Sequence, residues 1–130
     1  MHKNLKVFFI VCFCAFVASF IIQTVFQKSL AGDMSLWGSN PGWQREIAFW
    51  NVGCAIISLL QLKYSINRTA FPALLGFTIL FILLGTNHLF AILIDPMTKF
   101  HWPPFIMNYV GVFFGVKSII EYKKGEYDEK

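Results

Sequence analysis

The sequence predicts an all-α integral membrane protein, with one four-span domain over residues 1–130 that folds as an up-down-up-down bundle. Charged residues make up only 14% of the chain, whereas a soluble domain carries about 25%. Four apolar stretches are each long enough to cross a hydrocarbon core of roughly 30 Å at about 1.5 Å per residue. Short connections force neighbouring helices to run antiparallel. The stretches are Val7–Phe26, Gln44–Leu62, Thr69–Ile94 and Pro104–Ile120.

The first stretch resembles a signal peptide, because Lys3 and Lys6 precede it and Ser29-Leu30-Ala31 follows it. Its apolar run is longer than the usual signal core of about 7–15 residues. We therefore expect a retained helix.

Turn and capping residues mark the other three helices. Asn40 can cap the second helix, with Pro41 at its first position. Pro72 is expected in the first turn of the third helix, where proline is tolerated. Asp95-Pro96 predicts the end of that helix, and Pro103-Pro104 predicts the start of the fourth.

Basic residues gather at the N-terminus, near residues 63–68 and at the C-terminus, and fewer lie in the other two connections. Because positive charge stays on the cytoplasmic side, we expect both termini in the cytoplasm. Trp37, Trp43 and Trp102 would then lie in an aromatic belt at the opposite surface. No basic surface remains to follow a phosphate backbone, so nucleic acid is not an expected partner.

Two helices carry stripes of small and polar residues. These stripes should face protein, because polar groups are not stabilised by contact with lipid tails. Gly111 and Gly115 belong to one stripe and could let a second copy or a larger membrane complex approach closely. The stripes are Asn108, Gly111, Gly115 and Ser118, and Asn51, Cys54, Ser58 and Gln61.

Polar residues from three of the predicted helices fall at one depth, in the outer third of the bilayer. An ionisable group at mid-membrane costs about 2.5–3.5 kcal/mol on insertion scales, and partners or a shallow position lower that cost. We expect these residues to form a pocket open to the outer leaflet. The candidate ligand-binding residues are Glu46, Trp50, Asn51, Asn87, His88 and Asn108.

Three interpretations of this layer remain open. The amides and His88 can simply cross-link helices, while Glu46 interacts with the positive end of its own helix. The layer can bind an amphipathic ligand, a lipid or a quinone, or a membrane partner. Glu46 and His88 can also exchange protons in an enzyme or transporter. We favour ligand or partner binding over a self-sufficient enzyme, and a structural subunit of a larger membrane complex is a further alternative.

No cofactor or metal is expected. Glu46, His88, His101 and Asp95 lack the spacing of a metal-binding motif. A bis-histidine haem would need a second deep histidine besides His88.

The stretch Trp43–Gly53, with Gly85-Thr86-Asn87-His88 and Asn108-Tyr109, resembles small bacterial four-helix membrane proteins grouped as DoxX-like. The resemblance covers all four stretches and implies a four-helix bundle in a bacterial inner membrane, with a glutamate at the outer start of the second helix. It implies no agreed activity. Some DoxX-like proteins are associated with thiol-stress systems, but this chain lacks the exposed cysteine pair that such a role would need.

Overall fold

The computed structural model describes residues 3–29, 35–38, 40–64, 67–97 and 99–128. This part of the chain forms four long α-helices and one short 3-10 helix, without strands. The helices α1, α2, α3 and α4 are long and apolar enough to cross a membrane, so the predicted all-α four-helix fold is confirmed. The elements are α1 (Lys3–Thr24), α2 (Pro41–Tyr64), α3 (Asn67–Ile94), η2 (Lys99–His101) and α4 (Trp102–Asp128).

The helix boundaries follow the local sequence. The Asn40 side-chain oxygen accepts a hydrogen bond from the Trp43 backbone N–H at 3.1 Å, and α2 begins at Pro41 as predicted. After α3 ends, the Asp95 carboxylate accepts a hydrogen bond from the Met97 N–H at 3.0 Å. Pro72 lies inside α3 and not in its first turn, because α3 begins at Asn67, before the apolar stretch itself.

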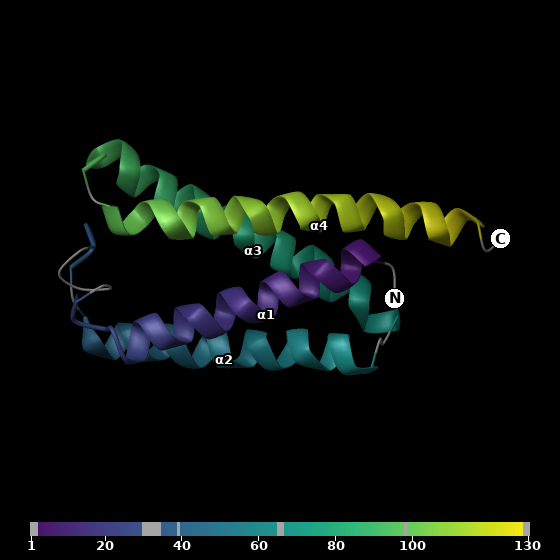
Figure 1. Ribbon diagram of the computed structural model, residues 1–130, viewed down its shortest axis with the longest axis horizontal. Helices are drawn as coiled ribbons and strands as arrows, with labels where there is room; N and C mark the ends of the chain where they lie inside the picture. Colours follow the sequence, from purple (N-terminus) through teal and green to yellow (C-terminus); the bar gives the residue numbers. More distant parts are fainter. Residues whose placement is uncertain (1–2, 30–34, 39, 65–66, 98, 129–130) are drawn as a thin grey trace.

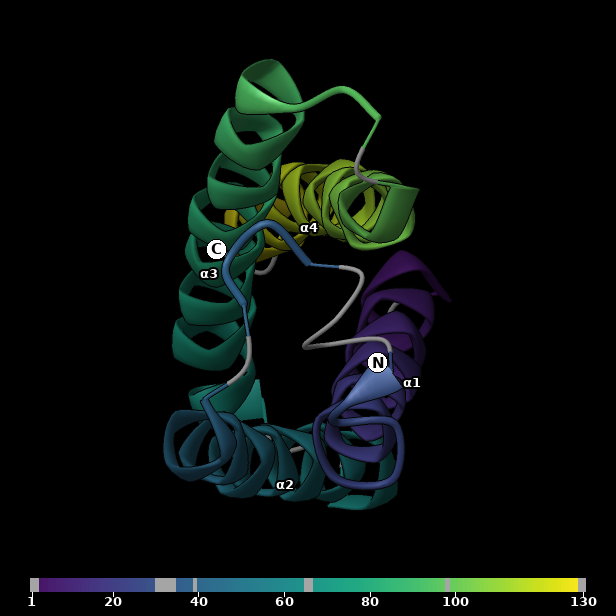
Figure 2. The same ribbon diagram turned by 90° about the vertical axis from the view of Figure 1, so that its left-hand side faces the viewer.

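The four helices form two antiparallel hairpins. α1 packs chiefly against α2, α3 packs chiefly against α4, and α1 also contacts α4. We call the end of the bundle that holds residues 25–29, 35–38 and 95–97 the loop end, and the opposite end, where α1 begins and α4 finishes, the terminal end (Figure 1). α3 crosses the bundle obliquely: it starts beside the end of α2 and finishes on the far side of α4 (Figures 1 and 2).

Aromatic rings fill the centre of the bundle. Phe8 and Phe9 of α1 are fully buried, and the Phe8 ring meets Phe81 of α3 edge-on, with 6.3 Å between centroids. Phe16 stacks on Phe81 and meets Phe77 edge-on, with centroids at 5.8 and 5.1 Å. These rings pack α1 against α3, although the two helices contact each other over only a short part of their length.

Glycines let α3 and α4 approach closely. A Cβ atom at Gly111 would lie 2.5 Å from the Phe81 ring, and one at Gly115 would clash with the Thr78 hydroxyl. Both glycines are therefore buried against helices of their own chain. The surface that the sequence analysis assigned to a second copy is filled within the chain, which removes its support for an oligomer.

Polar stripes of α2 and α4 face inward beside the aromatic core, and many large apolar side chains face outward, unlike in a soluble bundle. The predicted stripes on α2 and α4 are buried, as expected for helices whose outer surfaces contact lipid. Large apolar side chains are exposed on all four helices, including Phe49, Leu83, Phe90 and Phe113. This pattern places the protein in a lipid bilayer.

Candidate functional site

Three of the six predicted site residues lie on the outside of the bundle. Glu46 and Trp50 are exposed on α2, and Asn87 is exposed on α3. At about 100° per helical residue, Glu46 lies about 200° around α2 from the buried Gln44 and about 140° from Asn51. The Glu46 carboxylate therefore lies away from the side of α2 that faces α1.

Glu46 and His88 are not brought together. The oblique course of α3 carries its last turns to the far side of α4 (Figure 2). His88 belongs to these last turns, whereas Glu46 belongs to the start of α2. Within the described part of the chain, no hydrogen bond or ion pair involves the Glu46 side chain. Proton exchange between these two residues thus has no contact to support it.

Asn108 is buried in α4 and serves its own helix. Its side-chain nitrogen donates a hydrogen bond to the Pro104 carbonyl at 2.7 Å. Gly85 of α3 packs closely against it, since a Cβ there would lie 3.3 Å from the Asn108 Cβ. Asn108 is a packing residue of the α3–α4 contact and does not face a pocket.

His88 instead meets His101, which is completely buried in η2. The two Nδ1 atoms are 3.1 Å apart, and the Nε2 atom of His101 accepts a hydrogen bond from the Leu36 backbone N–H at 3.1 Å. Three segments thus meet at the loop end: the connection between α1 and α2, late α3 and η2.

These contacts determine where the imidazole protons lie. Because His101 Nε2 accepts from Leu36, a neutral His101 carries its proton on Nδ1 and donates it to His88 Nδ1. His88 then carries its own proton on Nε2. A metal bound at His101 Nδ1 would require that nitrogen to be unprotonated. Nε2 would also have to stay unprotonated to accept the hydrogen bond from Leu36, whereas the second ring nitrogen of a metal-bound histidine usually donates a hydrogen bond. The pair is therefore built for an N–H···N hydrogen bond.

The described residues also contain no group of three or more His, Cys, Asp or Glu side chains that could hold a metal ion.

Trp37 packs on both histidines and completes a loop-end cluster of Leu36, Trp37, His88 and His101. Its ring centroid lies 5.0 Å from His88 and 4.5 Å from His101. The turn that contains Trp37 is closed by the Gly38 N–H, which donates to the Ser35 carbonyl at 3.2 Å, and Gly38 adopts φ +72°, a conformation that favours glycine. The contacts of this cluster hold the connection between α1 and α2 (the first connection) against the α3–α4 hairpin.

The sixth predicted residue, Asn51, belongs to a polar seam between α1 and α2. Its side-chain nitrogen donates to Ser19 Oγ of α1 and to the Ile47 carbonyl, both at 2.9 Å. Nearer the loop end, Gln44 Nε2 donates to the Gln27 backbone carbonyl at 3.5 Å. The seam is thus polar from the middle of the hairpin to the loop end.

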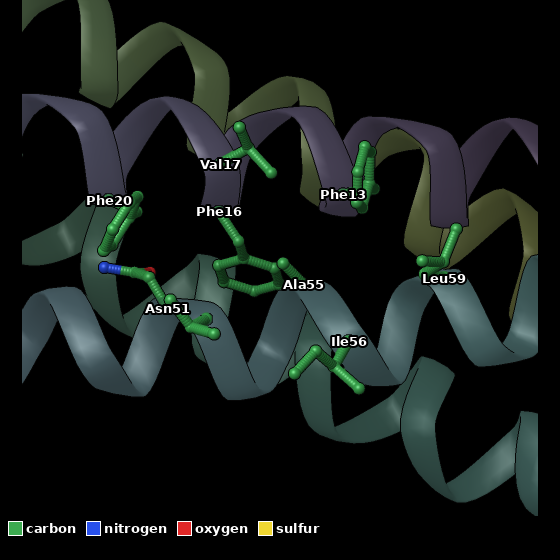
Figure 3. Close-up of a pocket in the computed structure, with 9 residues that line it drawn as sticks. Phe13, Phe16, Val17, Phe20, Asn51, Ala55, Ile56 and Leu59 are labelled. Atoms are coloured by element: carbon green, nitrogen blue, oxygen red, sulfur yellow. The ribbon is translucent and has the colours of Figure 1, made fainter.

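An apolar groove continues along the same seam toward the terminal end (Figure 3). It has a volume of about 140 Å³. Its rim is exposed on the outside of the bundle at Val52 and Ile56. The groove therefore opens toward lipid and runs parallel to the helices. Asn51 lies at the end nearer the loop end, which we call the polar end, although its amide donates into the seam and exposes no polar surface to the groove. The walls include Phe13, Phe16 and Phe20 of α1, and Asn51, Ala55 and Leu59 of α2.

Sequence reasoning missed two parts of this arrangement. It considered His101 only as a metal ligand and Trp37 only as part of an aromatic belt, since nothing in their spacing shows that they meet. The seam carried a readable signal: Ser19, Gln23 and Gln27 are four residues apart on one face of a helix, and Gln44 lies seven before Asn51.

Comparisons of the chain with family models, curated proteins and solved structures found no match, so any function is argued from this geometry.

Proposed function

We propose that the protein binds an amphipathic membrane molecule by holding a segment of its acyl or isoprenoid chain in the α1–α2 groove. The observation that carries this proposal is the groove itself. It is lined by three phenylalanine rings and by aliphatic side chains, and it opens on the surface that contacts lipid. A flexible hydrocarbon chain matches both its shape and its chemistry.

The size of the groove limits what it can hold. At about 140 Å³ it resembles an engineered apolar cavity of about 150 Å³ that binds benzene, and it is smaller than ligand pockets of about 300–1,000 Å³. It takes one chain segment, and the rest of the molecule lies outside. The head of the ligand must then lie beyond one end of the groove, and the polar end is at Asn51.

Exposed charge supports an orientation for this site. The terminal end carries more exposed basic side chains than the loop end, which has Lys28, Arg45 and Lys99. Under the positive-inside rule the terminal end faces the cytoplasm, and the polar end of the groove faces the outer leaflet of a bacterial inner membrane. The exposed lysines at the terminal end are Lys3, Lys6, Lys63, Lys117, Lys123 and Lys124.

Val52→Trp tests the groove, because Val52 lies at its rim and is 37% exposed. The indole should fill the groove from outside without crowding the core. Because lipid is already apolar, the bound chain gains only packing contacts, so we expect a loss of roughly threefold to tenfold in affinity. Native mass spectrometry of the purified protein with added phospholipid measures the bound fraction.

Val116→Trp is the matched control, since Val116 is 45% exposed on α4 and does not line the groove. It should leave the bound fraction unchanged. Equal retention by the two tryptophan variants would contradict the proposal.

A further inference from the structure

Two buried amide oxygens lie on the loop-end side of the groove without a hydrogen-bond donor. They are Oε1 of Gln23 on α1 and Oε1 of Gln44 on α2, and no residue in the described ranges donates to either. Gln44 is only 6% exposed. A buried acceptor without a donor is unfavourable, and native structures usually supply it with a partner.

The orientation of the Gln44 amide is not arbitrary. Its nitrogen lies 3.5 Å from the Gln27 carbonyl oxygen, so rotating the amide would bring two oxygens together. The Gln27 side chain donates to the Pro41 carbonyl at 3.0 Å and not to the Gln44 oxygen. The Gln44 oxygen thus remains the free acceptor.

The contacts of the hairpin place both acceptors beyond the polar end of the groove. Ser19 meets Asn51, and Gln27 meets Gln44, so Gln23 lies between these two contacts along α1. Gln44 is seven residues from Asn51, or about 10 Å along the helix. Neither side chain lines the groove itself, so the head of a molecule whose chain occupies the groove would extend along the seam toward them, and the two side chains would have to turn toward it to expose their buried oxygens.

We infer that the ligand of the α1–α2 groove carries a head group that donates hydrogen bonds, an ammonium or a hydroxyl, to Gln23 and Gln44. This inference rests on the proposed function. An oxidised quinone head has carbonyl acceptors only, and a choline head has methyl groups in place of N–H donors. An anionic oxygen would face the lone pairs of both amides. Ethanolamine and glycerol hydroxyl heads fit this site.

Phosphatidylethanolamine and phosphatidylcholine with identical chains provide the first test, because both are zwitterionic and they differ in N–H donors. Native mass spectrometry of the full-length protein in a mixture of equal amounts should show at least a threefold excess of bound phosphatidylethanolamine. Gln44→Leu keeps the side-chain size but removes the acceptor, and it should bring the ratio close to one. Gln23→Leu should act in the same direction.

Glu46→Gln serves as the control for charge at this level of α2, because Glu46 lies on the opposite side of the helix. It should leave the ratio unchanged. Thermal unfolding of each variant shows whether the fold is retained, and Gln23→Leu provides an independent reading if Gln44→Leu unfolds.

A second pair, diacylglycerol and its 3-O-methyl ether, distinguishes hydroxyl from ammonium donors. Preference for the donor-bearing member of either pair, lost in Gln44→Leu, supports the inference and identifies the donor. Equal binding within both pairs overturns it and means that water satisfies the two oxygens. If that occurs while Val52→Trp still weakens all four ligands, the groove proposal stands; if Val52→Trp has no effect, the groove proposal fails as well.

Discussion

The two hairpins solve the same packing problem in different ways. In the α3–α4 hairpin, Gly85, Gly111 and Gly115 let the backbones approach until Phe81 and Thr78 leave no space between them. In the α1–α2 hairpin, phenylalanines of α1 face α2 across a seam that stays polar at one end and hollow in the middle. The comparison teaches that a glycine opposite a ring lets two helices close on each other, whereas the phenylalanines of α1 opposite α2 leave a groove between the helices.

Gly115→Leu should give the largest effect, because a side chain there collides with Thr78 and the ring of Phe8. Overpacking of a tight core costs about 1–3 kcal/mol, and we expect the upper part of that range. Thermal unfolding in detergent measures the loss. Gly53→Leu is the control, since nothing lies within 4 Å of a Cβ at Gly53. Equal destabilisation by the two substitutions would show that the α3–α4 contact is no tighter than an open helix face.

His101→Phe should follow, because it keeps an aromatic ring but leaves the Leu36 N–H and His88 without their partner. Breaking these hydrogen bonds should lower the free energy of unfolding by about 1–3 kcal/mol. It should also speed proteolysis within residues 25–40.

His88→Phe is the matched variant: it breaks the bond between the two imidazoles but keeps the Leu36–His101 bond, so its effect should be smaller. Unchanged cleavage in His101→Phe would mean that the loop-end cluster does not hold the first connection to the α3–α4 hairpin.

The Ser19–Asn51 contact should give the smallest effect. Hydrogen bonds between membrane helices contribute about 0.6 kcal/mol on average. A double-mutant cycle of Ser19→Ala and Asn51→Leu, followed by unfolding in detergent, should give a coupling energy near that value. A coupling of zero would mean that Asn51 acts only through the Ile47 carbonyl of its own helix.

Helix spans and inward-facing stripes could be predicted from the sequence, because both depend on local spacing. Asn40 and Pro41 start α2 where the capping chemistry placed them, and the stripe from Asn51 to Gln61 is buried as expected. Depth along each helix could also be counted, which correctly put Glu46 and His88 near the same end of the bundle.

Rotation and tilt could not be predicted in the same way. The tilt of α3 depends on contacts such as Phe81 against Gly111, which join residues from different helices and leave no trace in either helix alone. The tilt of α3 separates His88 from Glu46 and places His88 in contact with His101. The polar seam is readable in part, since the stripe that contains Asn51 predicts a buried face, and Ser19 and Gln23, four residues apart on α1, extend the seam on the other helix.

The hydrogen bond from Leu36 to His101 sets an order for assembly. Its two ends are 65 residues apart, and a ribosome adding about 5–20 residues per second needs roughly 3–13 s to make the stretch between them. The first hairpin is therefore synthesised while residues 35–38 still lack their later neighbours. The contact between this connection and the α3–α4 hairpin forms late in biogenesis, and a chain truncated before η2 would lack it.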